Sequence, residues 1–303
     1  MALKEVETMI NIIQKYKLFM GVSAAVILAG IISMLIFGLN QDIDFVGGTT
    51  MHVNIGTQFN NDEISDVVNQ QINIKPSSIQ KAGEGEKEVI IKTTQINTEQ
   101  RNKVFEALKQ KYGLTQDNLL STDNVTATVG KELKFQALIA TLIASVLMLV
   151  YISFRFEFKS GVAAVIALIH DVLVMLAVYA ILQVPVNVSF IAAILTIVGY
   201  SINDTIIVFD RIRENNKYAK KEQFDDVVNK SIWQTIARSI NTSLTTLLTI
   251  TALYVLGVPS IKDFALPLIV GILSGTYSSI FIASPIWVLW REWDAKRKKI
   301  KTA

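Results

Sequence analysis

Long apolar stretches alternate with short polar ones along this chain of 303 residues. Five segments contain no Asp, Glu, Lys or Arg: 18–41, 135–154, 172–203, 239–261 and 264–290. About 20 apolar helical residues cross the hydrocarbon core of a bilayer, and the polar break at 183–187 divides one long stretch into two helices. The pattern therefore predicts six membrane spans, near residues 18–38, 133–154, 161–182, 188–209, 233–257 and 264–290. The first is expected to be an uncleaved anchor, because its apolar core exceeds that of a secretory signal.

The segment 39–132 has the pattern of a small folded domain. Alternating apolar residues predict strands at Thr49–Ile55, Ser77–Ala82, Glu88–Thr93 and Asn124–Val129. Helical spacing predicts helices at Asn61–Ile72 and at Thr98–Tyr112, the latter ending at Gly113. The order β-α-β-β-α-β matches a ferredoxin-like unit. We expect an α-helical polytopic membrane protein with six transmembrane helices and a small extracytoplasmic α+β ferredoxin-like domain.

The basic residues predict the orientation in the membrane, because Lys and Arg are retained in cytoplasmic loops. They gather in the N-terminal arm, after spans two and four, and in the tail, whereas the alternate short loops hold only Lys262. Both termini are therefore expected to be cytoplasmic. The domains follow: 1–38, a cytoplasmic arm and the first span; 39–132, the outer domain; 133–290, spans two to six; and 291–303, a basic cytoplasmic tail.

Composition supports the membrane assignment and excludes several functions. The chain is 51% hydrophobic and only 18% charged, and it has no cysteine, so no disulfide is possible. The sequence shows no nucleotide-binding loop, no nucleophile–base set and no metal-ligand cluster, which argues against an enzyme, a cofactor or a bound metal. The basic tail is expected to set orientation and to contact anionic membrane lipids; nucleic-acid binding is the less favoured alternative.

Two charged residues lie inside the predicted spans at similar depth. Asp204 precedes Arg211 by seven residues, which buries it roughly 10 Å from the cytoplasmic edge. Arg238 follows the interfacial Trp233 by five residues, which buries it by about 7–8 Å from the same side. Charged groups at this depth are costly and usually functional. A static Asp204–Arg238 ion pair is the structural alternative, although such pairs gain little net stability over apolar packing.

Other polar residues accompany this pair. Asn203 adds polarity beside Asp204, and Thr242, Thr245 and Thr249 continue the face of Arg238 at helical spacing. The threonines either line a wet path or bond their own helix carbonyls. His170 and Asp171 lie near the middle of the third span, as supporting polar residues or as a buried hydrogen-bonded pair.

The sixth span carries a small-residue pattern. Gly271 and Gly275 are four residues apart, a spacing that lets two helices approach closely. Packing is the favoured interpretation, and Pro267 and Pro285 are expected to bend this helix.

Five stretches resemble the SecF family, the smaller membrane subunits of the SecD–SecF complex of the Sec protein translocase. They are DIDFVGGTT after the first span, HD in the third, GYSINDTIIVFDRIREN in the fourth, ARSINTSLTTLLTITALYVLG in the fifth and FALPLIVGILSGTYSSIFIASPI in the sixth. The resemblance covers nearly the whole chain, and the stretches in the fourth and sixth spans are its most specific part.

The resemblance implies membership of the RND superfamily of ion-driven transporters and residence in the cytoplasmic membrane of a prokaryote. It implies three partners: SecD, the SecYEG translocon and a translocating unfolded polypeptide. It implies ion coupling at Asp204 and Arg238, by H+ or, as the alternative, Na+. Asp44, Phe45, Gly47 and Gly48 match the family's junction into the outer domain, where we expect a tight turn built on glycine conformations.

The resulting hypothesis is export of proteins driven by the ion gradient. A proton entering from outside neutralises Asp204, frees Arg238 and lets spans four and five repack, while the outer domain grips and releases the emerging chain. Two alternatives stay open. Another RND-type exporter would move lipids or drugs. Co-purification of the chain with a SecD-like partner distinguishes this alternative from the protein-export hypothesis. A non-transporting scaffold predicts that Asp204→Asn is silent.

Overall fold

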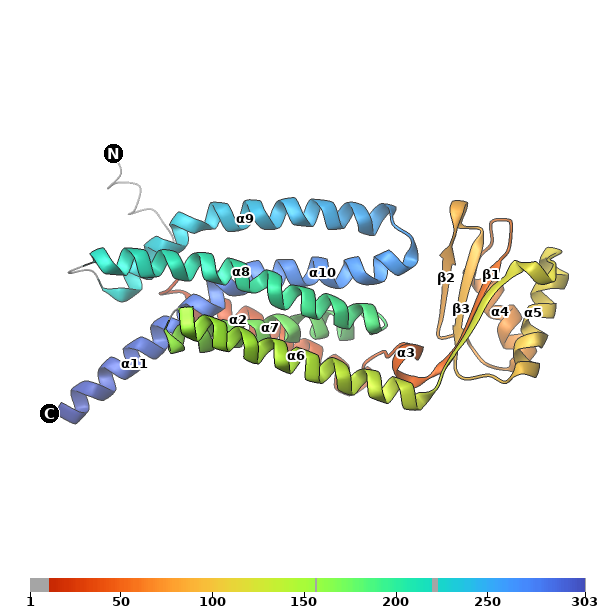
Figure 1. Cartoon of the computed structure of the whole chain (residues 1–303), viewed down its shortest axis with the longest axis horizontal. Coiled ribbons are helices and arrows are strands. Elements are labelled where there is room, and N and C mark those ends of the chain that lie inside the picture. Colours follow the sequence, from red (N-terminus) through yellow and green to blue (C-terminus); the bar gives the residue numbers. More distant parts are fainter. Residues whose placement is uncertain (1–10, 156, 220–222, 303) are drawn as a thin grey trace.

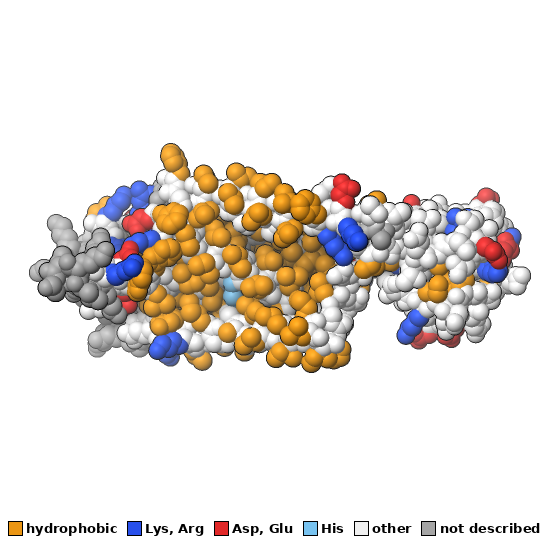
Figure 2. Space-filling view, turned by 90° about the horizontal axis from the view of Figure 1, so that it is seen from below, with side chains coloured by type: hydrophobic (Ala, Val, Ile, Leu, Met, Phe, Trp, Pro, Cys, Tyr) orange, Lys and Arg blue, Asp and Glu red, His pale blue; other side chains and the backbone are white. Residues whose placement is uncertain are grey.

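The protein is elongated, with a helical bundle at one end and a small sheet domain at the other (Figure 1). The computed structural model describes residues 11–155, 157–219 and 223–302. The start of the first long helix, at Tyr16, and the end of the last, at Thr302, belong to the end of the bundle far from the sheet domain (Figure 1). Hydrophobic side chains cover the face of the bundle seen in Figure 2, and Lys and Arg side chains gather at the end opposite the sheet domain. This distribution is the one expected for a membrane protein.

Six helical regions of the described chain are long and apolar enough to cross a membrane, which confirms the predicted number of spans. Their helices are α2 Tyr16–Phe37, α6 Ala127–Arg155, α7 Phe158–Leu182, α8 Val188–Tyr218, α9 Phe224–Leu256 and, for the sixth span, α10 Pro259–Ser278 with α11 Ser284–Thr302. The break predicted at 183–187 separates α7 from α8. There Gln183 adopts φ 52° after α7, and the side chain of Asn187 caps α8 by accepting from Phe190 N at 3.0 Å.

The sixth span changes its winding between α10 and α11. Residues Ser279–Ala283 form a π-helical turn immediately before Pro285. Pro285 has no N–H to donate to the preceding turn, and the Ser284 hydroxyl donates to the Ser279 carbonyl at 3.0 Å. The change of winding thus coincides with the proline, and the Ser284 hydroxyl adds a hydrogen bond within the π-helical turn.

The outer domain is a four-stranded antiparallel sheet with two helices on one face. Its elements are β1 Gly48–Asn54, α4 Asn61–Ile72, β2 Ser78–Ala82, β3 Glu88–Thr93, α5 Thr98–Tyr112 and β4 Leu119–Val125, with short 3-10 turns at Glu84–Glu86 and Gln116–Asn118. The strand order β2-β3-β1-β4 is that of a ferredoxin-like unit, which confirms the predicted fold. Its core is formed by Met51, Val53, Val89 and Ile91 against the apolar faces of α4 and α5.

The last strand was predicted in the wrong place. Sequence pattern indicated Asn124–Val129, whereas β4 runs from Leu119 to Val125 and α6 already begins at Ala127. Residues of β4 lie at an edge and do not alternate in burial. Its position is set by pairing with β1, where Gly48 lies opposite Val125, and no local pattern records that pairing.

The junction between bundle and outer domain contains a short helix that the sequence did not predict. Helix α3, Ile43–Val46, is capped by the Asp42 side chain and ends at Gly47, whose φ is 85°. Gly48 then starts β1, where an added Cβ would lie 2.3 Å from the Thr93 carbonyl oxygen. Phe45 is buried in the core of the bundle, and Asp44 accepts from Val188 N at 3.2 Å. The expected tight turn is therefore a helical turn followed by a glycine pair.

Candidate functional site

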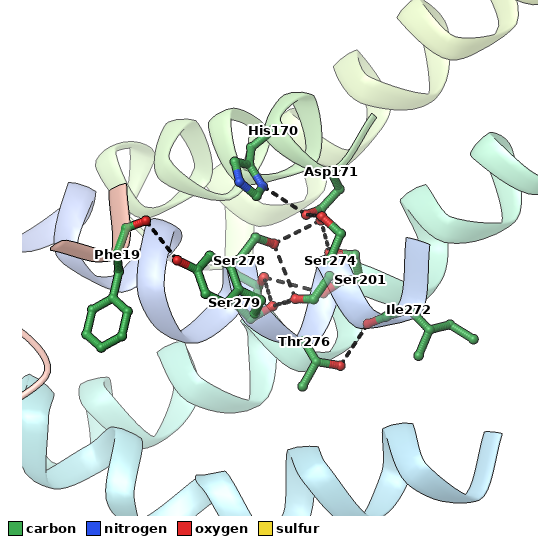
Figure 3. Close-up of polar contacts among 12 residues, drawn as sticks. Phe19, His170, Asp171, Ser201, Ile272, Ser274, Thr276, Ser278 and Ser279 are labelled. Atoms are coloured by element: carbon green, nitrogen blue, oxygen red, sulfur yellow. Dashed lines mark hydrogen bonds and ion pairs between the residues drawn. The ribbon is translucent and has the colours of Figure 1, made fainter. Parts of the chain in front are cut away.

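Asp171 is the centre of a polar network inside the bundle (Figure 3). Its carboxylate accepts three serine hydroxyls: Ser201 of α8 at 2.7 Å, and Ser274 and Ser278 of α10 at 2.7 and 2.9 Å. Asp171 lies on α7 and is only 1% exposed. Every serine here lies within hydrogen-bonding distance of the carboxylate, so both oxygens of Asp171 have partners. Three membrane helices are joined at one side chain.

His170 stands beside this network. Its Nδ1 lies 3.2 Å from Asp171 Oδ1, and its ring stacks on Tyr277 at a centroid distance of 6.2 Å. Its Nε2 is buried and has no hydrogen-bond partner among the described residues. The sequence left a supporting role or a buried hydrogen-bonded pair open for His170 and Asp171. The structure shows them bonded to each other, with Asp171 also bonded to two further helices.

Close packing of α8 against α10 brings the serines together. A Cβ at Gly271 would lie 2.4 Å from Ile197 Cγ1, and one at Gly275 would lie 2.8 Å from Ser201 Cβ. Only glycine permits this approach, which places Ser201 within reach of Asp171. Both glycines therefore act in packing, as predicted. Ser274 and Ser278, four residues apart on α10, fall on one face of the helix.

Asp204 is buried but poorly satisfied. It is 1% exposed and lies on α8. Its Oδ2 accepts from the Ser243 hydroxyl of α9 at 3.3 Å, and Ser243 is 2.5 Å from the Thr276 hydroxyl of α10. Its Oδ1 has no hydrogen-bond partner among the described residues. The two buried carboxylates therefore differ: Asp171 accepts three short hydrogen bonds, whereas Asp204 accepts one of 3.3 Å and is otherwise influenced by the nearby Thr276 hydroxyl and the charge of Arg238.

Arg238 does not pair with Asp204 in this structure. Among the described residues no ion pair joins them, and Arg238 is exposed on the flank of α9. The side of α9 that faces the bundle carries Ser239 and Ser243 instead, which are 1% and 4% exposed. Depth alone predicted that Asp204 and Arg238 lie at the same level, but the rotation of a helix about its axis places Arg238 on a neighbouring face. The static ion pair considered from the sequence is absent here.

The threonines of α9 bond to their own helix. Thr242 donates to the Arg238 carbonyl at 2.8 Å, Thr245 to Thr242 at 2.9 Å and Thr249 to Thr245 at 3.2 Å. Thr245, Thr249 and also Asn203 are exposed on the outside of the bundle. Of the two interpretations of this stripe, the structure shows the self-bonded one.

Sequence reasoning missed four members of the site: Ser243, Ser274, Thr276 and Ser278. A signal was present, because small hydroxyl residues recur within one apolar span at spacings of two and four. Such residues are common packing elements in membrane helices, so the pattern gains meaning only once Asp171 is seen to face it. The described residues contain no group of His, Cys, Asp or Glu that could hold a metal ion.

Comparison with known proteins gives the family. Residues 104–293 match the family model described as protein export membrane protein SecD/SecF, C-terminal. The chain belongs to the SecD/SecF family. It is 37% identical to the protein translocase subunit SecF of Alicyclobacillus acidocaldarius, with 95% of this chain and 94% of that protein covered. It is 40% identical to the protein translocase subunit SecDF of Bacillus subtilis over 93% of this chain.

A solved SecDF structure has the same fold. The crystal structure of SecDF, a translocon-associated membrane protein from Thermus thermophilus, matches 95% of this chain with a TM-score of 0.81 and 33% identity. The chain spans 39% of that structure and 38% of the Bacillus SecDF, whereas it spans nearly the whole length of the SecF relatives. This chain therefore corresponds to the SecF portion of a SecDF protein.

Proposed function

We propose that this chain is an accessory subunit of the Sec protein translocase that works with a SecD-type subunit in the cytoplasmic membrane of a prokaryote. The pair uses the proton gradient, or a sodium gradient as the alternative, to promote the export of proteins delivered by a SecYEG-type channel. Both termini lie in the cytoplasm, and the outer domain meets the emerging unfolded polypeptide. Family membership and the intramembrane carboxylates support the proposal.

The observation that carries the ion-coupling step is the incomplete hydrogen bonding of Asp204. A carboxylate that is 1% exposed and has an oxygen without a partner is costly to leave ionised in a membrane interior. Such a group gains most from taking up a proton or from binding a cation. Asp171 has no comparable need, because three hydroxyls already hold it. We therefore assign ion uptake to Asp204 and a positioning role to Asp171, His170 and the serines.

Arg238 is placed on the side of the bundle where a partner is expected. The most apolar 18-residue window of α9 has only 11% of its residues buried within this chain. Arg238 and Thr245 of α9 are exposed, as is Asn203 of α8. A charged arginine inside a membrane needs protein or water around it. We infer that the SecD-type subunit covers this face and that Arg238 acts between the two subunits, where it responds to the charge on Asp204.

The free energy that the membrane potential supplies for each transferred charge is modest. One elementary charge that crosses 100 mV supplies about 2.3 kcal/mol. That amount is enough to shift a two-state equilibrium of helix packing by roughly fiftyfold, since each 1.4 kcal/mol is a factor of ten. The small-residue contact between α8 and α10 is a suitable place for such a change, because Asp204 lies on one helix and Thr276 on the other.

The test is the export of a secreted precursor in cells whose own subunit is depleted. Asp204→Asn keeps the size of the side chain and removes its ability to ionise. We expect the gradient-dependent part of export to be lost while the complex still assembles, as judged by co-purification with the partner. Asp226→Asn, at the exposed start of α9, is the matched control and should leave export intact. Undiminished export by Asp204→Asn would favour the scaffold alternative. Purification of the chain with no SecD-type partner attached would favour another RND-type exporter.

A further inference from the structure

The face of the sheet opposite α4 and α5 is turned toward the outer end of the bundle (Figure 1). Strand alternation places Ser78 and Gln80 of β2, Ile90 and Lys92 of β3, and Thr50 of β1 on that face, because Lys92 lies opposite both Ser78 and Thr50. The other face carries the apolar core. The outer domain therefore meets the membrane bundle through a largely polar surface.

Lys92 is the cation of this surface. Its Nζ donates to Asp42 Oδ2 at 2.5 Å, and the two side chains are only 14% and 4% exposed. Asp42 uses its other oxygen to cap α3 at Ile43 N, and its own N–H donates to the Val186 carbonyl at 2.9 Å. Asp42 therefore ties β3 of the outer domain to the connection between α7 and α8.

A second carboxylate lies on the same surface. Asp263, in the first part of α10, accepts from Gln80 of β2 at 3.4 Å and from Asn187, the cap of α8, at 3.2 Å. It also interacts electrostatically with Lys92 and with Asp42. One lysine thus balances two carboxylates in a partly desolvated place, where removing one partner leaves an uncompensated charge. We call Asp42, Gln80, Lys92, Asn187 and Asp263 the outer-domain seat.

The seat is connected to the polar network through a single helix. Helix α10 begins beside β2, carries Asp263 near its start, and carries Ser274, Thr276 and Ser278 further along. Ser274 and Ser278 hold Asp171, and Thr276 lies next to the partner of Asp204. Asp263 and Ser274 belong to one continuous helix, in which Pro267 removes a single backbone hydrogen bond between them. A displacement of α10 as a body at the network therefore reaches the seat.

We propose that Lys92, through its ion pair with Asp42, is a positioning residue that orients the outer domain on the bundle, and that the movement of α10 reaches the outer domain through the seat. The orientation part stands on the contacts of the seat alone. The transmission part rests on the proposed function. Lys92 is suited to both tasks because it contacts the junction through Asp42 and lies on β3, next to β2, whose Gln80 contacts Asp263 of α10.

The experiment measures distance distributions between two spin labels in the full chain, purified with its partner subunit. The chain has no cysteine of its own to be labelled. The two labels are attached at Gln110→Cys on α5 and at Leu182→Cys at the outer end of α7, and both positions are exposed. The variants are Lys92→Met, which keeps the length of the side chain, and Lys92→Arg, which keeps its charge. Lys109→Met is the control, since Lys109 pairs with Glu106 on the surface of α5.

We expect Lys92→Met to broaden the distribution, Lys92→Arg to restore it and Lys109→Met to leave it unchanged. An unchanged distribution in Lys92→Met would overturn the orienting role, whatever the function of the protein.

Adding Asp204→Asn tests transmission. Asp204→Asn is expected to shift the distance distribution when Lys92 is intact. In combination with Lys92→Met it is expected to cause no shift. A shift that persists in Lys92→Met, or no shift in the parent chain, would overturn transmission. Neither result depends on export, so failure of the seat and failure of the proposed function are separate outcomes.

Discussion

At the residue scale, the contrast between two buried aspartates organises the membrane half. Asp171 accepts three hydroxyls and joins α7, α8 and α10, whereas Asp204 has one hydrogen bond and an oxygen without a partner among the described residues. Equal burial therefore does not mean equal roles. A satisfied carboxylate rigidifies the core around it, and an unsatisfied one is available for an ion.

The structural role of Asp171 leads to a stability prediction. Ser278→Ala removes a hydroxyl that donates to Asp171 at 2.9 Å, and hydrogen bonds to charged groups contribute about 1.5–3 kcal/mol each. We expect the free energy of unfolding to fall by an amount in this range, measured by denaturant unfolding in detergent micelles. Thr196→Ala is the control, because Thr196 is exposed and bonds only the carbonyl of Ala192 in its own helix. Equal stability of the two variants would contradict the role of Asp171.

At the element scale, two glycines bring α8 and α10 into close contact near the site. Gly271 and Gly275 face Ile197 and Ser201 without room for a Cβ. Helix α10 therefore holds its serines against α7 and α8 by shape, and the polar contacts follow from that fit.

A substitution on this contact tests the argument. Gly271→Val would place its Cβ 2.4 Å from Ile197, and overpacking of this kind costs about 1–3 kcal/mol or more. We expect lower thermal stability and loss of export. Gly21→Val is the matched change, because no atom lies within 4 Å of a Cβ at Gly21. If both variants behave like the parent, the glycines of α10 are not a packing device.

Local signals explain which elements were predictable from the sequence. Helices Asn61–Ile72 and Thr98–Tyr112 have the predicted bounds, because Asn60 and Asn97 cap their starts and Asn73 and Gly113 end them in left-handed conformations. Strand β4 was misplaced because a partner strand, not its own residues, defines it. Helix α3 was missed because four residues carry no periodicity.

The candidate site, too, was only partly predictable from the sequence. The depth of Asp204 and Arg238 in the membrane was estimated by counting residues, and it stays a prediction. Which face of a helix meets which neighbour depends on packing, so the exposure of Arg238 and the serines around Asp171 were not predictable. The intramembrane carboxylates could be named in advance, and their different environments could not.

At the scale of the whole molecule, the chain is a membrane bundle with a charge-balanced seat for an outer domain. The polar network lies within the bundle, the seat lies at its outer end, and α10 runs from one to the other. Two families of contacts thus share one helix, an arrangement suited to converting a change at Asp204 into a change in the outer domain. The exposed face of α9 leaves a side of the bundle for a second subunit, in keeping with the longer SecDF relatives.

Ion uptake at Asp204 can be measured as gradient-driven ion flux in liposomes that contain the chain with its SecD-type partner. A pH-sensitive dye inside the liposomes reports proton entry after a membrane potential is imposed, and a parallel series with a sodium indicator tests the alternative ion. The account predicts flux of one ion in the parent complex, loss of that flux in Asp204→Asn, and normal flux in Asp226→Asn. Equal flux in the parent and in Asp204→Asn would show that Asp204 does not take up the coupling ion.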